Sequence, residues 1–301
     1  MRLSGWMLLL TLIPWPACAQ LASHEPNAKP SITAQEVVDR IKAHVGIPWL
    51  EQTRDTFKAG DPQTPATGIA VTMMATQEVL QRAVANGQNL IITHEPTFFD
   101  DPDKAETVSQ GDSDPVLADK RAFIAKNHLV IWRFHDHWHR MHPDGIELGN
   151  VRALGWEKFQ DPNNQYLFTI PETTVGKLAD EVQKKFAIAA VRIVGDREMK
   201  VTRVALSPGF AGAKREIVAL EMPDVQVLLA GETREWETVE YVADAVTQGK
   251  HKALIVLSHV PSEQRGMDEC VRWLKTFVTE VPVQFVPTPD PFAEGQLAPK
   301  R

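Results

Sequence analysis

The sequence predicts an α/β protein with two related lobes, each containing a mainly parallel sheet covered by helices. Short apolar runs alternate with amphipathic helical patterns along most of the chain, which is typical of parallel strands joined by helices. The alternation occurs in two stretches, so we expect one lobe over residues 33–160 and a second over residues 161–301. Histidines and carboxylates also follow four of the expected strands, where open α/β sheets bind ligands.

The first lobe begins with a helix that has a clear start signal. Thr33 and Glu36 have the spacing of a capping box, and apolar residues then recur at helical intervals. Thr76 caps a second helix, which Asn86-Gly87 ends. Three apolar runs are expected to form strands at 68–74, 89–93 and 129–134, with a further helix at about 115–127.

The second lobe repeats the alternation of helices and strands, although no residue-level repeat accompanies it. Helices are expected near 173–186, 212–220 and 234–248. Strands are expected at 191–194, 201–206, 225–230 and 253–257.

Composition excludes some classes of partner. The 301 residues have a formal net charge of -7, and 43% are hydrophobic, as in a globular protein with a sizeable core. Such a chain has no general basic field to attract nucleic acid or anionic lipid. We therefore expect no nucleic-acid partner. No segment after the N-terminal region has the length and apolarity of a membrane span.

The first nineteen residues have the pattern of a secretory signal peptide. Arg2 precedes a short apolar run, and Ala17-Cys18-Ala19 supplies an A-x-A cleavage site. We expect cleavage after Ala19, a polar linker over residues 20–32, and a periplasmic or extracellular mature protein. Lipidation of Cys18 stays open as an alternative.

Four expected strands end beside histidines or carboxylates, which are ligands suited to Zn, Mn, Fe, Co or Ni. We expect these side chains to converge on one crevice, because strand ends meet at one edge of a sheet. Three histidines in five residues are unusual for a plain polar loop, and at least one of the three is expected to be spare. The four sets are His94-Glu95, the cluster His135-Asp136-His137-Trp138-His139, Glu232, and His259 with Glu263.

The spacing within two of these sets constrains the local structure. His94 and Glu95 are adjacent, so both can face one site only from a strand-to-loop turn. A helix that begins near Ser262 would place Glu263 in its first turn and His259 just before it. A carboxylate there could bridge two ions, which typically lie about 3.5–4 Å apart. For His94 or His259 alone, a hydrogen-bonded boundary residue is an equally good interpretation.

Other motifs have structural interpretations. His44, His128 and His251 fall at helix ends or in loops, and we expect them to be structural. The glycine-bearing turn over residues 207–212 fits a phosphate-binding loop or a tight strand-to-helix turn equally well.

Taken in order, these segments resemble the Nif-three-like family of dinuclear metal-centre hexameric proteins, often named GTP cyclohydrolase I type 2. The resemblance spans roughly the mature chain. The similar segments are 91–96, 135–139 with Gly145 and Leu154-Gly155, Gly231-Glu232, and 258–266, of which the last is the most specific.

The resemblance implies metal ligands at His94, Glu95, His139, His259 and Glu263. Two of these positions depart from the family, which has histidine in place of Glu95 and aspartate in place of His139. Both replacements can bind metal, and together they leave the charge of the ligand set unchanged. Asp136 and His137 stay open as alternatives to His139.

The resemblance also implies a function and an assembly. We expect an exported, hydrolase-like protein in which two divalent ions activate water for an unknown small-molecule substrate. Glu232 would act as a general base or would orient a ligand. A ring of six copies is implied. The family's GTP ring-opening label does not suit an exported protein, and the alternatives are a non-catalytic metal-binding or metal-delivery protein and a structural ring protein.

Overall fold

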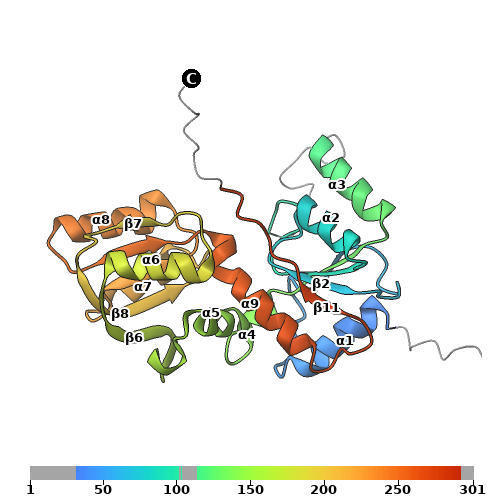
Figure 1. Cartoon of the computed structure of the whole chain (residues 1–301), viewed down its shortest axis with the longest axis horizontal. Helices are drawn as coiled ribbons and strands as arrows, with labels where there is room; N and C mark the ends of the chain where they lie inside the picture. Colours follow the sequence, from blue (N-terminus) through green and yellow to red (C-terminus); the bar gives the residue numbers. More distant parts are fainter. Residues whose placement is uncertain (1–31, 102, 104–113, 293–301) are drawn as a thin grey trace, which may run out of the picture. The chain divides into compact units, whose positions relative to one another are not determined.

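The computed structural model describes residues 32–101, 103 and 114–292, which form two sheets covered by helices (Figure 1). This confirms the predicted α/β class, although both sheets are mixed. The expected signal peptide and nearly all of the expected linker lie outside the described residues. Within the described part of the chain, no helix is long and apolar enough to cross a membrane.

The first sheet has the strand order β1-β4-β3-β2-β11 and is mainly parallel. Its parallel strands β4, β3 and β2 are buried along their whole length, which explains their continuous apolar sequences. β1 pairs with β4 in the antiparallel direction, and β11 pairs with β2 in parallel. The strands are β1 (Phe57–Ala59), β2 (Ile69–Thr72), β3 (Leu90–Thr93), β4 (Val130–Arg133) and β11 (Val283–Phe285).

Helices cover both faces of the first sheet. α1 (Ala34–His44) begins with the predicted capping box at Thr33, and α2 (Gln77–Ala85) begins after the predicted cap Thr76. α2 and α3 (Pro115–Lys126) pack on one face, whereas α1 packs on the other (Figure 1). The predicted start signals therefore place the helices within one or two residues.

The second sheet has the strand order β5-β6-β8-β9-β10-β7 and contains more antiparallel pairing than expected. Only β8, β9 and β10 pair in parallel, whereas β5, β6 and β7 join antiparallel. The strands are β5 (Gln160–Asp161), β6 (Asn164–Thr174), β7 (Arg192–Val194), β8 (Lys200–Ser207), β9 (Val227–Ala230) and β10 (Ala253–Val256).

Helices also cover the second sheet on both faces. α6 (Val175–Phe186) packs into one apolar cluster with β8, β9 and β10. α7 (Ala213–Glu221) and α8 (Glu240–Thr247) contribute to the cluster on the other face. A π-helical turn, η4 (Glu235–Val239), precedes α8, so the expected helix over 234–248 is irregular at its start.

The chain returns to the first sheet after it has completed the second. α9 (His259–Leu274) follows β10, and its Met267, Cys270 and Leu274 lie in the core of the first sheet. β11 then joins that same sheet. The division of the chain into lobes at residue 160 stays a prediction.

Two short helices that the sequence did not predict lie beside α9. They are α4 (Asp136–Arg140) and α5 (Gly145–Leu154). α5 and α9 approach closely at glycines, since a Cβ on Gly149 would lie 2.3 Å from the carbonyl oxygen of Arg265. This close packing fixes the position of α9, and two of the predicted ligands lie in the first five residues of this helix.

Candidate metal centre

The carboxylate of Glu263 lies at the centre of the predicted ligands. Its Oε2 is 3.1 Å from His259 Nε2 and 3.7 Å from His94 Nε2. Its Oε1 is 3.7 Å from His139 Nε2. Glu263 is almost fully buried. One buried carboxylate therefore faces histidines that follow three different strands.

Glu95 approaches the same nitrogen of His259 as Glu263 does. Its Oε1 is 3.4 Å from His259 Nε2 and 3.5 Å from His135 Nε2. Both His94 and Glu95 are buried in a bend directly after β3, which is the strand-to-loop turn that their adjacency requires. The structure therefore brings together all five side chains predicted as ligands.

The start of α9 differs from the expectation. The helix begins at His259 and not near Ser262, so His259 is its first residue and Glu263 lies one turn later. Residues four apart on a helix share one face, which explains why both side chains point into the cluster. The backbone reaches this position through Ser258, which has a φ of 73°.

The histidine cluster after β4 divides into two groups. His135 and His139 face the predicted ligands, whereas His137 is fully buried on the other side of α4. The ring of His137 stacks on Trp49 with centroids 3.6 Å apart, and its Nδ1 bonds to Asp55 at 2.6 Å. His137 is thus a core histidine, which matches the expectation that one of the three is spare.

Asp136 is the other alternative to His139, and both of its carboxylate oxygens already have hydrogen-bond partners. Its Oδ2 accepts from the Thr53 hydroxyl at 2.9 Å and from the Arg54 backbone at 2.8 Å. Its Oδ1 lies 3.0 Å from His135 Nδ1. These contacts make Asp136 a carboxylate that orients His135, and they favour His139 as the ligand.

Three residues that support the cluster were not identified from the sequence. Asp55 accepts hydrogen bonds from the backbone amides at the start of α4 and so fixes that helix. The guanidinium of Arg133 is fully buried, donating to the His94 carbonyl and to Glu95 Oε2, each at 3.0 Å. Arg133 could have been recognised in the sequence, because it is a charged residue at the end of an apolar strand. The remaining residue is Asp144.

Asp144 connects the two sheets beside His139. Its Oδ2 lies 3.0 Å from His139 Nδ1 and accepts a hydrogen bond from the Tyr166 hydroxyl of β6, also at 3.0 Å. Its Oδ1 accepts from the Ile146 and Glu147 amides and thereby caps α5. One carboxylate therefore fixes both a helix start and the orientation of His139.

Glu232 and the 207–212 turn complete the surroundings. Glu232 Oε2 lies 3.0 Å from His259 Nδ1, so this carboxylate orients a predicted ligand. Gly209 lies directly against Glu263, and a Cβ there would be 2.1 Å from Glu263 Oε1. The Gly209 amide donates to Ser262 Oγ at 3.0 Å. The turn over residues 207–212 therefore packs closely against the carboxylate of Glu263.

The carboxylates of the cluster dominate its electrostatics. Burial, together with the neighbouring histidines, lowers the pKa of His94, which keeps this ring neutral as a ligand requires. Burial opposes charge on His259 and His139, but nearby carboxylates outweigh it and raise their pKa values to about 12 and about 8. Carboxylates thus dominate the potential at these nitrogens. Buried carboxylates of this kind need compensating positive charge.

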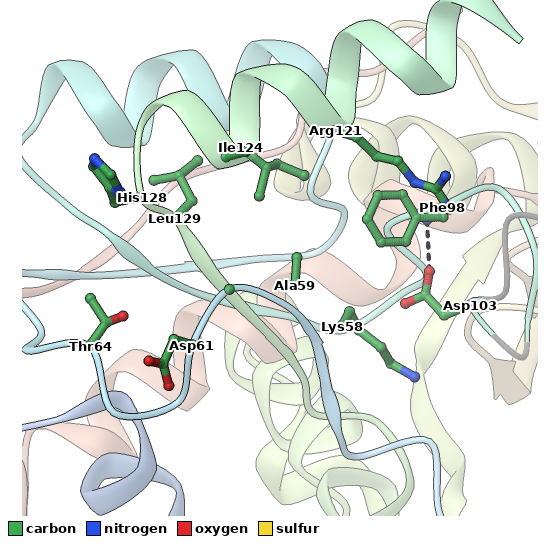
Figure 2. Close-up of a pocket in the computed structure, with 12 residues that line it drawn as sticks. Lys58, Ala59, Asp61, Thr64, Phe98, Asp103, Arg121, Ile124, His128 and Leu129 are labelled. Atoms are coloured by element: carbon green, nitrogen blue, oxygen red, sulfur yellow. Dashed lines mark hydrogen bonds between the residues drawn. The ribbon is translucent and has the colours of Figure 1, made fainter. Parts of the chain in front are cut away.

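The cluster lines a cleft of about 1240 Å³ between residues of both sheets, which is large enough for a small molecule. A separate cavity of about 560 Å³ lies against β1 and α3 (Figure 2). Lys58, Arg121 and Asp103 line this second cavity, and Asp103 accepts a hydrogen bond from the Phe98 amide. None of the predicted ligands is among its described lining residues.

The chain also matches the model of a known protein family. The model of the Duf34/NIF3 (NGG1p interacting factor 3) family matches residues 32–291. The chain belongs to this family. The resemblance stated from the sequence is therefore confirmed.

Two relatives of this Duf34/NIF3 chain are named GTP cyclohydrolase 1 type 2 homolog. The Clostridium acetobutylicum protein is 26% identical over 164 residues, covering 50% of this chain and 58% of the relative. The Clostridium perfringens protein is 23% identical over 218 residues, covering 68% of this chain and 76% of the relative. The chain thus spans less than two thirds of the length of the first relative.

Solved structures show the same NIF3-like fold. The Staphylococcus aureus hypothetical protein SA1388 has a TM-score of 0.69 at 16% identity, covering 88% of this chain and 99% of that one. A Bacillus cereus protein related to NIF3 has a TM-score of 0.68 at 13% identity, with the same coverage. Reduced HcgD from Methanocaldococcus jannaschii has a TM-score of 0.58 at 13% identity, covering 85% and 98%. At these identities the likeness concerns the fold alone.

Proposed function

We propose that this Duf34/NIF3 protein is a metal-dependent, hydrolase-like protein that holds two divalent ions in the cluster around Glu263. The position of Glu263 is the observation on which this proposal depends. Its two carboxylate oxygens face different histidines, at distances of 3.1–3.7 Å. A carboxylate placed between two sets of nitrogen and oxygen donors is suited to bridge two ions.

The donors divide into two sets around Glu263. His94 and His139 lie close together on one side, with their Nε2 atoms 3.1 Å apart. Glu95 and His259 form the second set, with Glu95 Oε1 3.4 Å from His259 Nε2, and ligand atoms of His94, Glu95 and Glu263 also lie within 4.8 Å of one another. Each set, completed by Glu263, offers three ligands to one ion. Nitrogen and oxygen donors without thiolate suit Zn, Mn, Fe, Co or Ni.

The chemistry follows from the site and the cleft above it. Two such ions, when bound, activate water near neutral pH and polarise a carbonyl or phosphoryl oxygen. Glu232 orients His259 from the cleft side, and its partly exposed carboxylate can also accept a proton there. Glu232 is therefore the candidate general base for an unknown small-molecule substrate.

The test is a metal analysis combined with an activity panel. Protein purified without chelators should contain two metal equivalents per chain, and it should hydrolyse at least one member of a phosphoester, amide and nucleobase panel. His259→Ala should abolish that turnover, whereas His251→Ala, at an exposed position, should not. Metal that exchanges rapidly in a protein without turnover would favour the delivery alternative and contradict the hydrolase proposal.

Export and self-assembly are further proposals, supported by the N-terminal pattern and by the resemblance respectively. N-terminal sequencing of protein from the native host should give a chain that starts near Gln20, and an intact Met1 would contradict export. Sedimentation should give a hexamer, and a monomer at micromolar concentration would contradict the ring.

A further inference from the structure

Three imidazole rings meet on one side of the cluster, and only two of them belong to the ligand set derived from the family resemblance. One nitrogen from each of His94, His135 and His139 lies within 4.8 Å of the other two. The ring centroid of His94 is 4.6 Å from that of His135 and 4.9 Å from that of His139. His94 is fully buried, and the other two rings are half-buried. His135 is the additional member.

All three rings are oriented in the same way. In each ring, Nδ1 faces a carbonyl or carboxylate oxygen, which can only accept a hydrogen bond. Nδ1 therefore bears the proton in the neutral ring, and the lone pair is left on Nε2. The three contacts, each of 3.0 Å, join His94 to Phe134 O, His135 to Asp136 Oδ1, and His139 to Asp144 Oδ2.

The free nitrogens then face other acceptors and not donors. His94 Nε2 and His139 Nε2 are 3.1 Å apart, and His135 Nε2 lies 3.5 Å from Glu95 Oε1. With all three rings neutral, these are pairs of lone pairs at close range, which need either a shared proton or a bound cation between them. Nδ1 held by a carboxylate or carbonyl is also the usual support of a histidine that binds metal through Nε2.

We propose that His135 is itself a metal ligand, so that His94, His135 and His139 form an imidazole-rich site for one divalent ion. This inference rests on the proposed function and adds to it a ligand and a difference between the two sites. The second site, with Glu95, His259 and Glu263, is rich in carboxylate.

The difference in donors predicts a difference in metal preference. Imidazole suits Zn, Ni and Co, whereas carboxylate oxygen suits Mn and Mg. The imidazole-rich site should therefore fill first when metal-free protein is titrated with Co²⁺ or Zn²⁺. The carboxylate-rich site should accept Mn²⁺ more readily than its neighbour does.

The experiment titrates metal-free full-length protein with Co²⁺ and follows calorimetry and the visible absorption of the bound ion. His135→Ala should weaken the first binding event by more than about tenfold and shift its visible bands, because an imidazole nitrogen is lost. The second event should be nearly unchanged. His251→Ala serves as the matched control and should bind like the native protein.

A measurement on the native protein avoids any dependence on how the variant folds. X-ray absorption of protein loaded with one Zn²⁺ equivalent should show three imidazole ligands. Fewer than three imidazoles, or a His135→Ala titration equal to the native one while His139→Ala loses an ion, would overturn this inference and leave the proposed function intact. If neither His94→Ala nor His139→Ala alters metal binding, the proposed function itself is wrong.

Discussion

Two helices, one after a strand of each sheet, present a pair of candidate ligands four residues apart to the same cleft. β4 leads into α4, and His135, directly before this helix, and His139 within it both face the cluster. β10 leads into α9, where His259 and Glu263 do the same. Residues four apart lie on one side of a helix, so each segment directs both side chains of its pair into the cleft.

The two helices differ in what fixes them. α9 has 16 residues, and its apolar side lies in the core of the first sheet, so packing positions its first turn. α4 has only five residues, and the backbone amides at its start donate hydrogen bonds to the carboxylate of Asp55, which fixes it. Its histidines are oriented by carboxylates, Asp136 and Asp144. A long helix positions ligands by burial, whereas a short one requires polar partners from elsewhere in the chain.

The largest effect on metal binding is expected at the α9 pair. Glu263→Ala should lose both metal equivalents, because its carboxylate faces His94 and His139 as well as His259. Asp268→Ala, on the same helix and paired with Arg272, should keep both. Metal analysis after gel filtration measures the difference. Retention of one full equivalent by Glu263→Ala would show that this carboxylate does not bridge the sites.

A smaller effect is expected from the partners of the α4 pair. Asp144→Ala should weaken one ion by about tenfold to a hundredfold, as is typical when a partner that orients a ligand is removed. It should also cost about 1 kcal/mol of unfolding free energy, because α5 loses its cap. Titration with Zn²⁺ and denaturant unfolding measure the two effects separately.

Asp114→Ala is the matched control for the second effect. Asp114 caps α3 through the Val116 and Leu117 amides, away from the described cluster. This variant should lose a similar stability and no metal affinity. Equal metal affinity in Asp144→Ala and Asp114→Ala would mean that His139 needs no orientation by Asp144.

Sequence patterns predicted the parts of the fold that depend on local signals. The buried strands β2, β3 and β4 are continuous apolar runs, and Thr33 and Thr76 mark helix starts. β6 was not predicted because its burial does not alternate regularly. α4 was not predicted because a helix of five residues is too short for a periodic signal. The return of β11 to the first sheet depends on long-range packing alone.

The candidate site shows the same division between local and long-range information. The side chains that follow strand ends were identified because, within each sheet, parallel strands end at the same edge, where ligands bind. The sequence left Asp136 and His137 open as alternatives to His139, because the positions of these side chains depend on Asp55, which lies 80 residues before His135. The local sequence does not indicate which side chain a distant loop brings to the start of a helix. The metal-binding roles themselves stay predictions.

The most direct test concerns the two positions at which this chain departs from the family pattern. Metal content should be measured on Glu95→Ala and His139→Ala, with His44→Ala as the control, because His44 lies on α1 and stacks against Phe277. Each of the first two variants should lose one metal equivalent, and His44→Ala should lose none. Unchanged metal content in both Glu95→Ala and His139→Ala would contradict a two-metal centre built on these replacements.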